Sequence, residues 1–307
     1  MSANPKPSVM KQAAMQITAG GSAGFIEVCL MHPLDVVKTR LQLQIKKPLG
    51  GGNTVYYNGV FDCFSKIARQ EGILAVYKGI IPPILAETPK RATKFVCFEQ
   101  YKTGLQKALG YDKATPLIYS LAGLGSGVTE AFVVNPFEVV KISLQADTAK
   151  TTSSPSTMIV AKEIIKRGGI GLNGLNKGLT STIGRNGTWN LIYFGFYHSV
   201  KDSVPQCQNP TADFFRKTGI GFASGTIASI ANIPFDVAKS RIQGPQPVAG
   251  EIKYKTCMKT IFIVAREEGF GALYKGLVPK VMRLGPGGAI MLIAYDYVYE
   301  FLQHQFP

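Results

Sequence analysis

The chain has 307 residues, of which 46% are apolar and 17% are charged, and its formal net charge is +15 at pH 7. Soluble domains contain about 25% charged residues, so this composition argues against an ordinary soluble domain. The sequence lacks a recognition helix, a basic tail and any CxxC pair among its five cysteines, so nucleic-acid binding, a metal site and a disulfide framework are not indicated.

The first apolar segment covers residues 13–42, and Glu27 is its only charged residue before the closing motif PLDVVK at 33–38. About 20 apolar residues are enough to cross a bilayer, so a transmembrane helix is predicted here. The twelve residues before the segment lack arginine, an apolar core and amphipathic spacing. We therefore expect no cleavable presequence.

A polar stretch follows the first segment and contains a short amphipathic run near 58–70, which predicts a surface helix. The stretch ends with EGILAVYKG at 71–79, and a second apolar segment covers 80–107. The first third of the chain is therefore predicted to form a long helix, a loop with a surface helix, and a second long helix.

This unit occurs three times along the chain. PLDVVK returns as PFEVVK at Pro136 and as PFDVAK at Pro234, 103 and then 98 residues after the preceding copy. Further amphipathic runs lie near 155–167 and 255–268, before the segments GLNGLNKG and EGFGALYKG. Two glycines stand nine and thirteen residues before each motif proline, which is the GxxxG spacing of closely packed transmembrane helices. These glycines are Gly20 and Gly24, Gly123 and Gly127, and Gly221 and Gly225.

The repeats predict an all-α membrane protein with six transmembrane helices in a threefold pseudo-symmetric bundle and three short surface helices. Charges interrupt several spans, and since charges inside a bilayer normally face a polar interior, the bundle should surround a water-filled cavity. The predicted spans are 13–42, 80–107, 115–145, 179–202, 213–243 and 277–303. The three repeats that form this single transmembrane domain are 13–107, 115–202 and 213–303.

The distribution of basic residues predicts the orientation of the bundle. Each long loop, 43–78, 146–178 and 244–276, contains five lysines and arginines, whereas 103–114 contains two and 202–212 contains none. By the positive-inside rule the three long loops share one side, and the even number of spans places both termini on the opposite side.

The triplicated motif Px[DE]xxK and the downstream pattern [DE]Gxxxx[YF]KG closely resemble the mitochondrial carrier family, over essentially the whole chain. Within the family, the stretches ILAETPKRATKF, GLGSGVTEAFVVNPFEVVK and NIPFDVAKSRIQGPQPV are similar to members that carry 2-oxodicarboxylates. The resemblance implies an antiporter of the mitochondrial inner membrane, with both termini in the intermembrane space. It would exchange 2-oxoadipate and related C5 to C7 oxodicarboxylates for 2-oxoglutarate by alternating access.

Other functions remain as alternatives to this interpretation. A citrate or other dicarboxylate exchanger is the strongest of them, and a nucleotide exchanger is weaker because an RRRMMM-like signature is absent. An intramembrane enzyme would need a nucleophile with a base or a metal cluster, and no GxSxG, HExxH, phosphate-loop or dinucleotide motif occurs, so no cofactor is expected. A scaffold that transports nothing would not need complementary charge rings.

The resemblance implies that the motif prolines Pro33, Pro136 and Pro234 bend their helices inward at the matrix end. A proline removes an intrahelical hydrogen bond and kinks a helix, so three such helices can converge. A single motif could be an ordinary helix end, but three copies in register argue against that. The ion pairs that would close this matrix gate are Asp35–Lys141, Glu138–Lys239 and Asp236–Lys38. The glutamines implied to brace these pairs are Gln42, Gln145 and Gln243.

A second charge ring is implied at the cytoplasmic mouth by the family pattern [YF][DE]xxK. FEQYK matches it, whereas YHSVK has His198 where an acid is expected and YDYVY has Tyr299 where a cation is expected. This departure predicts a weaker cytoplasmic gate. The implied partners are Glu99 with Lys201, Asp296 with Lys102, and His198 with Tyr299, the last without an ion pair.

A dianionic oxoacid would need cations that point into the cavity. Helical periodicity places Arg91 and Lys94 on the cavity side of the second span. Arg185 and Arg283 occupy positions where acid-transporting relatives hold substrate carboxylates, and an arginine fork can bind a carboxylate through two hydrogen bonds. Straight helices would turn both arginines away, so we expect nearby glycines and Pro286 to distort them. Asn186 could donate to a keto or carboxylate oxygen. Packing or contact with lipid headgroups is the alternative role for each cation.

Two acids and the Lys-Gly segments complete the predicted features. Glu27 and Glu130 stand six residues before their motif prolines and either tune the charge of the cavity or bridge helices. The Lys-Gly segments should cap matrix helices, and the resemblance implies bound cardiolipin there. A monomer with small dicarboxylates as its partners is expected.

Overall fold

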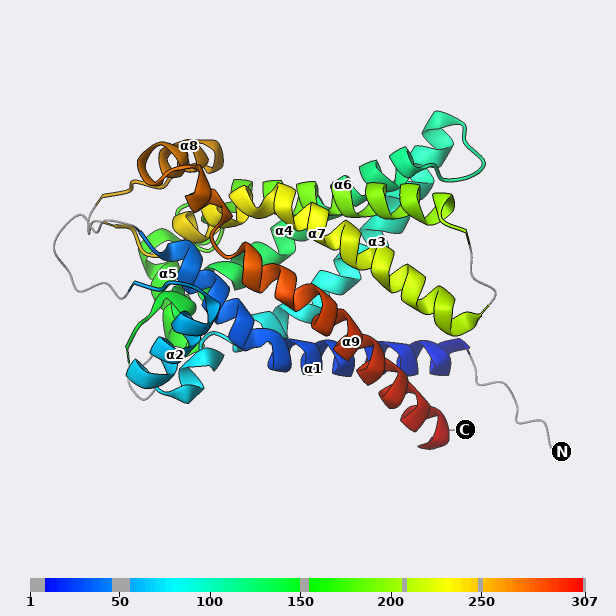
Figure 1. Ribbon diagram of the computed structural model, residues 1–307, viewed down its shortest axis with the longest axis horizontal. Helices are drawn as coiled ribbons and strands as arrows, with labels where there is room; N and C mark the ends of the chain where they lie inside the picture. Colours follow the sequence, from blue (N-terminus) through cyan, green and yellow to red (C-terminus); the bar gives the residue numbers. More distant parts are fainter. Residues whose placement is uncertain (1–8, 46–55, 150–154, 206–208, 248–250, 306–307) are drawn as a thin grey trace.

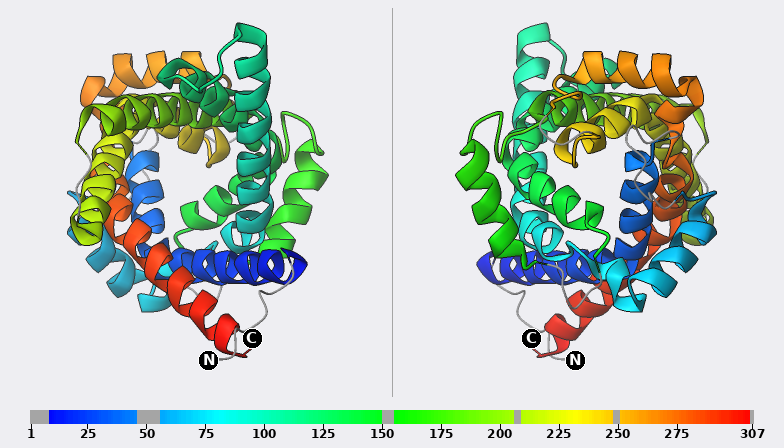
Figure 2. Two further views of the ribbon diagram at one scale, coloured as in Figure 1. Left: turned by 90° about the vertical axis from the view of Figure 1, so that its right-hand side faces the viewer. Right: turned by 90° about the vertical axis from the view of Figure 1, so that its left-hand side faces the viewer.

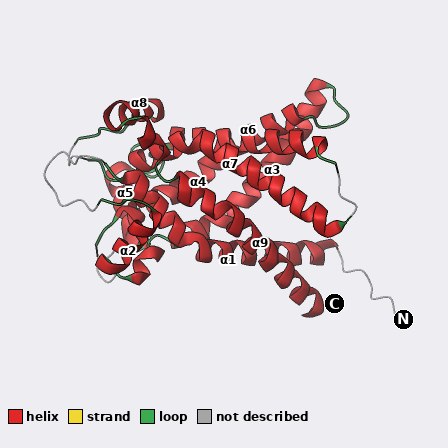
Figure 3. Cartoon of the chain, viewed as in Figure 1, coloured by secondary structure: helices red, strands yellow, loops and turns green. Residues whose placement is uncertain are grey.

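All regular structure in the described parts of the chain is helical (Figure 3). The computed structural model describes residues 9–45, 56–149, 155–205, 209–247 and 251–305. The fold class predicted from the three repeats is therefore confirmed.

Six long helices agree with the six predicted spans to within a few residues at each end. Each has at least 25 residues, and at 1.5 Å per residue this exceeds the roughly 30 Å thickness of the hydrocarbon core of a bilayer. The helices are α1 (Val9–Leu43), α3 (Ile81–Leu109), α4 (Pro116–Ala146), α6 (Leu179–Ser203), α7 (Pro210–Gln243) and α9 (Leu277–Gln305).

The long helices stand side by side in a ring (Figures 1 and 2). Around this ring α3 packs on α4, α4 on α6, α6 on α7, and α9 on α1. The described start of α1 and the described end of α9 lie at the same end of the bundle, which agrees with an even number of spans (Figure 1).

Hydropathy alone identifies only part of this ring. In the described residues, two segments are long and apolar enough to be recognised as membrane spans, Pro116–Ala146 and Phe270–Gln303. Charged residues interrupt the other long helices. Large apolar side chains such as Phe25, Leu30 and Phe132 are about half exposed or more, as expected for side chains that face lipid.

The predicted surface helices are present at the other end of the bundle: α2 (Val60–Gln70), α5 (Thr157–Gly168) and α8 (Cys257–Glu268). Short 3-10 helices, η1 (Ile73–Tyr77) and η3 (Phe270–Tyr274), follow α2 and α8. Each surface helix packs beneath the first long helix of its repeat and forms a small apolar core with it. These apolar cores hold the surface helices against the end of the bundle at which the motif prolines lie.

The three GxxxG pairs are not used alike. In repeat 2, a Cβ atom on Gly123 or Gly127 would lie 2.8 and 2.6 Å from carbonyl oxygens of α6, so only glycine allows this backbone contact. Gly20 has no atom of another segment near it, and Gly225 faces a flexible leucine at 3.4 Å. Close approach of two backbones is therefore found in repeat 2, whereas a Cβ atom on Gly24 of repeat 1 would meet the Glu87 side chain at 3.1 Å.

Candidate functional site

A polar cavity of about 400 Å³ lies inside the ring, and all six long helices contribute to its lining. Seven lysines and arginines line it, against five aspartates and glutamates. The lining therefore has an excess of positive charge, which suits a small anion. The four cations predicted from the sequence to hold substrate, Arg91, Lys94, Arg185 and Arg283, all belong to this lining.

Three ion pairs close the inner end of the cavity, next to the surface helices. Lys141 of α4 binds Asp35 of α1 at 2.6 Å, and Lys38 of α1 binds Asp236 of α7 at 2.8 Å. Lys239 of α7 completes the triangle by binding Glu138 of α4. These are the cyclic pairs expected from the sequence, and we refer to the six residues as the inner ring. Each motif proline lies inside its helix, two residues before the ring acid and five before the ring lysine, and α1 visibly changes direction in this half (Figure 1).

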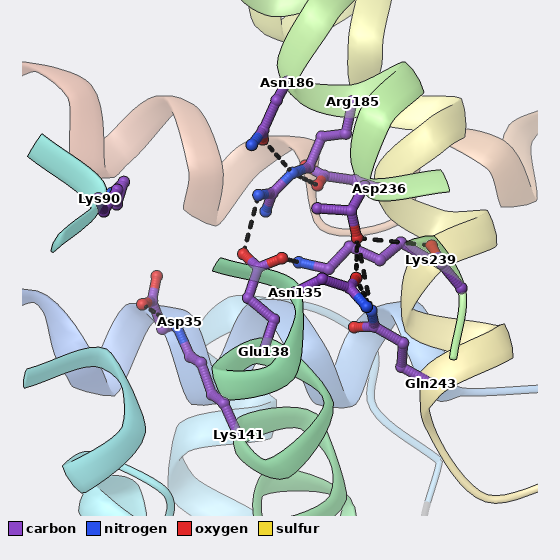
Figure 4. A network of polar contacts seen from close by, with 12 residues as sticks. Asp35, Lys90, Asn135, Glu138, Lys141, Arg185, Asn186, Asp236, Lys239 and Gln243 are labelled. Atoms are coloured by element: carbon purple, nitrogen blue, oxygen red, sulfur yellow. Dashed lines mark hydrogen bonds and ion pairs between the residues drawn. The ribbon is translucent and has the colours of Figure 1, made fainter. Parts of the chain in front are cut away.

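Every carboxylate of the inner ring is also bound by a second cation, which belongs to the second long helix of a repeat (α6 or α9). Arg283 of α9 contacts Asp35 at 2.6 Å. Arg185 of α6 contacts Glu138 at 2.8 Å (Figure 4). The third carboxylate, Asp236, is bound by Lys280 of α9 at 2.7 Å. Arg185 also lies 3.8 Å from Asp236, so it links two of the three ion pairs at the floor of the cavity.

Two predicted residues of this network have further contacts. Arg283 also binds Glu27 of α1 at 2.7 Å, so Glu27 faces the cavity and bridges two helices at once. The Arg185 Nε donates to the Asn186 Oδ1 at 2.9 Å, while the Asn186 Nδ2 is buried without a hydrogen-bond partner. Within the described residues that amide is a buried donor without a partner, and Asn186 belongs to the lining of the cavity.

On α3, the predicted cations contact aromatic and acidic side chains. Arg91 binds Glu87 one turn earlier at 2.5 Å. The Lys94 ammonium lies 5.2 Å from the centre of the Trp189 ring of α6, a cation–π contact. Both cations have one side open to the cavity. Glu130 lines the same space.

The three glutamines do not brace the ion pairs, so that expectation is wrong for the described residues. The Gln145 Oε1 accepts from the Thr39 hydroxyl at 2.6 Å, and the Gln42 Oε1 accepts from the Ser240 hydroxyl at 2.7 Å. Thr39 and Ser240 each directly follow a ring lysine. The equivalent residue of repeat 2 is Ile142, which has no hydroxyl, and Gln243 instead donates to Asn135 at 2.9 Å. The glutamines thus directly join the first long helices of neighbouring repeats, α1, α4 and α7.

The predicted cytoplasmic mouth, which we call the outer mouth, lies at the end of the cavity opposite the inner ring. The ion pairs expected there are absent from the described residues. Lys102 binds Glu99 of its own helix at 2.5 Å instead of Asp296. His198 stacks on Tyr119 of α4 with ring centres 3.5 Å apart, and Tyr299 stacks on Tyr295. No ion pair between Glu99 and Lys201 is formed among the described residues, and the outer ends of α3, α6 and α9 stand apart (Figure 2). The inner end is thus joined by ion pairs between helices, whereas the ion pairs expected at the outer mouth are not formed within the described residues.

Sequence reasoning missed several residues of the site. Lys280 stands three residues before Arg283 on α9, so its position one turn away was a usable signal. Asn232 and Trp189 also line the cavity, and Asn232 accepts from Lys280 and donates to the Arg185 carbonyl at 3.2 Å. Neither residue belongs to a repeated motif, so the pattern gave no signal for them.

Comparison with known proteins gives a consistent result along the whole chain. The family profile described as mitochondrial carrier protein matches residues 10–109, 112–206 and 210–306. The mitochondrial 2-oxodicarboxylate carrier of Bos taurus is 60% identical over 304 residues, which are 99% of each chain. The mitochondrial 2-oxodicarboxylate carrier 2 of Saccharomyces cerevisiae and the mitochondrial citrate transporter D of Aspergillus niger are each 42% identical over 292 residues, 94% of each chain.

Proposed function

Because this chain belongs to the mitochondrial carrier family, whose members are transporters of the mitochondrial inner membrane and not enzymes, we propose that it exchanges 2-oxodicarboxylates across that membrane. The proposed substrates are 2-oxoadipate and related C5 to C7 oxodicarboxylates, and the proposed counter-substrate is 2-oxoglutarate. The observation that carries this proposal is the cavity with paired arginines, in a chain 60% identical to a 2-oxodicarboxylate carrier.

The charge of the cavity supports a dianion. Its lining has two more cations than carboxylates, which matches a molecule with two carboxylates better than a nucleotide or a neutral solute. In this proposal Arg185 and Arg283 each hold one substrate carboxylate, and the free Asn186 amide donates to the keto oxygen. Arg91 and Lys94, on the opposite wall, contact the same carboxylates from the α3 side.

The shared carboxylates suggest how binding leads to opening. Arg185 and Arg283 now bind Glu138 and Asp35 of the inner ring. A substrate carboxylate would compete for the same guanidinium groups and leave each ring acid with its lysine alone. The inner end then opens more easily, because a ligand shifts a conformational equilibrium by its differential affinity for the two states. Pairing of Glu99 with Lys201 and of Asp296 with Lys102 would then close the outer mouth.

Citrate exchange is the second candidate, because a citrate transporter is among the 42% identical relatives. Reconstituted vesicles separate the two. The purified chain should take up labelled 2-oxoadipate only into vesicles loaded with an oxodicarboxylate, and unlabelled 2-oxoglutarate should inhibit this uptake more than citrate does. Faster exchange of citrate than of any oxodicarboxylate would overturn the proposed specificity.

The remaining expectations about the environment are proposals too. We propose that the chain works as a monomer with both termini toward the intermembrane space, and that cardiolipin phosphates bind where the Lys-Gly segments meet α3, α6 and α9. Backbone amides at a helix start and a nearby lysine suit a phosphate.

A further inference from the structure

Repeat 1 contains a buried network of three charged side chains beneath the inner ring. Arg40 and Lys78 both bind the carboxylate of Glu71, at 2.9 and 2.6 Å, and all three side chains are at most 5% exposed. Repeat 3 has the same network with N–O distances of 2.9 Å, formed by Glu268 with Arg241 and Lys275. In both repeats the glutamate neutralises cations that are withdrawn from water.

Both networks hold the end of a span that belongs to another repeat. Arg40 and Lys78 donate to the carbonyl oxygen of Asp147, just beyond α4, at 2.5 and 3.0 Å. Arg241 and Lys275 donate in the same way to the carbonyl oxygen of Gln44, just beyond α1. Asp147 and Gln44 each stand six residues after a ring lysine, so the two contacts are equivalent by the pseudo-symmetry. The third equivalent position, beyond α7, is Pro245.

Repeat 2 lacks both of the residues that would pair with its lysine. Ser143 stands where the other repeats have the arginine. Gly168 stands where they have the glutamate, directly before a glycine with positive φ. A Cβ atom on Gly168 would lie 2.3 Å from the Asn173 carbonyl oxygen, so no side chain fits there. Lys177 remains, and within the described residues it makes no ion pair.

A cavity of about 470 Å³ occupies the place of the missing side chains. Burial lowers the pKa of Lys177. Arg167 also lines the cavity, and its exposed guanidinium contacts Glu163 of its own helix. The Asp147 carboxylate is part of the wall, with its Oδ1 accepting from the backbone N–H of Ala149 at 3.0 Å. The residues that define this repeat-2 pocket are Ser143, Arg167, Asn173, Lys177, Gln243 and Pro245.

We propose that the repeat-2 pocket binds a small oxyanion, a carboxylate or a phosphate group, in place of the glutamate that repeats 1 and 3 supply themselves. Lys177 and Arg167 provide the positive charge, and the Ser143 hydroxyl provides a neutral donor. The bound anion would join α5 and the Lys-Gly segment of repeat 2 to the end of α7. A free anion of the matrix solution and a phospholipid headgroup offer the same chemistry. The site lies outside the central cavity and does not depend on the proposed transport substrate.

The test is the thermal unfolding of the purified full chain in detergent, with inorganic phosphate replacing chloride at constant ionic strength. We expect phosphate to raise the midpoint by about 2–4 °C in a saturable way, because a ligand that binds only the folded state stabilises it. Lys177→Gln should abolish the rise. Ser143→Glu should place a carboxylate beside Lys177, raise the midpoint without phosphate and remove the response, whereas the matched Ser143→Gln should keep the response. Arg283→Ala should also keep it, which separates this pocket from the central cavity.

A short-chain phosphatidic acid, compared with a phosphatidylcholine of equal length, identifies the source of the anion. A rise with inorganic phosphate indicates a free anion, and a rise with phosphatidic acid alone indicates a headgroup; in either case it must disappear in Lys177→Gln or Ser143→Glu. The proposal is overturned if neither probe raises the midpoint, or if both variants respond as the unaltered chain does.

Discussion

The two ends of the central cavity use their charged side chains in opposite ways. At the inner end, each carboxylate of the ring is bound by cations from two other helices. At the outer mouth, Glu99 binds Lys102 of its own helix, and His198 and Tyr299 stack on aromatic neighbours. Ion pairs within one helix cannot draw helices together, whereas pairs between helices can. The difference shows that closure of an end depends on partners in other repeats, and not on the number of charges present.

Of the changes that test this comparison, reversal of one charge in the inner ring should have the largest effect on the exchange rate. Asp35→Lys or Lys141→Asp alone would place like charges next to each other in a buried site, so we expect exchange in vesicles to be lost. The double reversal restores the pair between α1 and α4 and should recover a substantial part of the rate. Reversal of Asp35 with Lys38, on the same helix, is the control and should recover nothing. Rescue by the same-helix pair alone would refute the cross-repeat closure.

Removal of Arg185 or Arg283, the second cations bound to the inner ring, should have the next largest effect on exchange. Arg185→Ala and Arg283→Ala each delete a charge-assisted contact, worth about 1.5–3 kcal/mol, which corresponds to roughly ten- to a hundred-fold in substrate affinity. Exchange should fall to background while the folded protein remains in the membrane. Arg283→Lys keeps the charge but cannot bind Asp35 and Glu27 with one fork, and an intermediate rate is expected. Near-normal uptake by either alanine variant would remove these arginines from the substrate site.

An added ion pair at the outer mouth should have a smaller effect. His198→Asp with Tyr299→Lys supplies the cross-repeat pair that the outer ring lacks. It should stabilise the closed outer mouth, lower the maximal exchange rate severalfold, and protect cysteine probes in the outer part of the cavity from labelling. The two single variants serve as controls, because neither can form the pair. Unchanged labelling and rate in the double variant would mean that this position does not limit closure.

The glutamine contacts should have the smallest effect. Gln145→Met removes one neutral hydrogen bond to Thr39 while nearly preserving side-chain volume, so we expect a loss of about 0.5–1.5 kcal/mol in the free energy of unfolding. Thr39→Val should cost a similar amount. The double variant should cost less than the sum of the two, because the partners share one bond. Strict additivity would show that the bond between α1 and α4 contributes nothing.

Structural features that recur at equivalent positions of the three repeats could be predicted from the sequence. The six spans and the surface helices follow from motifs repeated three times, and the three inner pairs follow from the resemblance to the carrier family. Features that break the repeat could not be predicted. The glutamine partners depend on Thr39 and Ser240 against Ile142, and Asn232 belongs to no repeated motif. Which charges pair at the outer mouth depends on the conformation the chain adopts, and one sequence serves every conformation.

The central claim is that substrate draws Arg185 and Arg283 away from the inner ring and so exchanges a closed inner end for a closed outer mouth. Spin labels at Lys107→Cys on α3 and Glu300→Cys on α9, in a chain whose five native cysteines are replaced by serine, report the width of the outer mouth by pulsed electron resonance in lipid nanodiscs. We predict one long distance without substrate and a second, shorter distance when 2-oxoadipate is added, and a distance distribution in Arg283→Ala that 2-oxoadipate does not change. If 2-oxoadipate left the distance distribution of the labelled chain with Arg283 unchanged, or caused the same shortening in Arg283→Ala, the account would be contradicted.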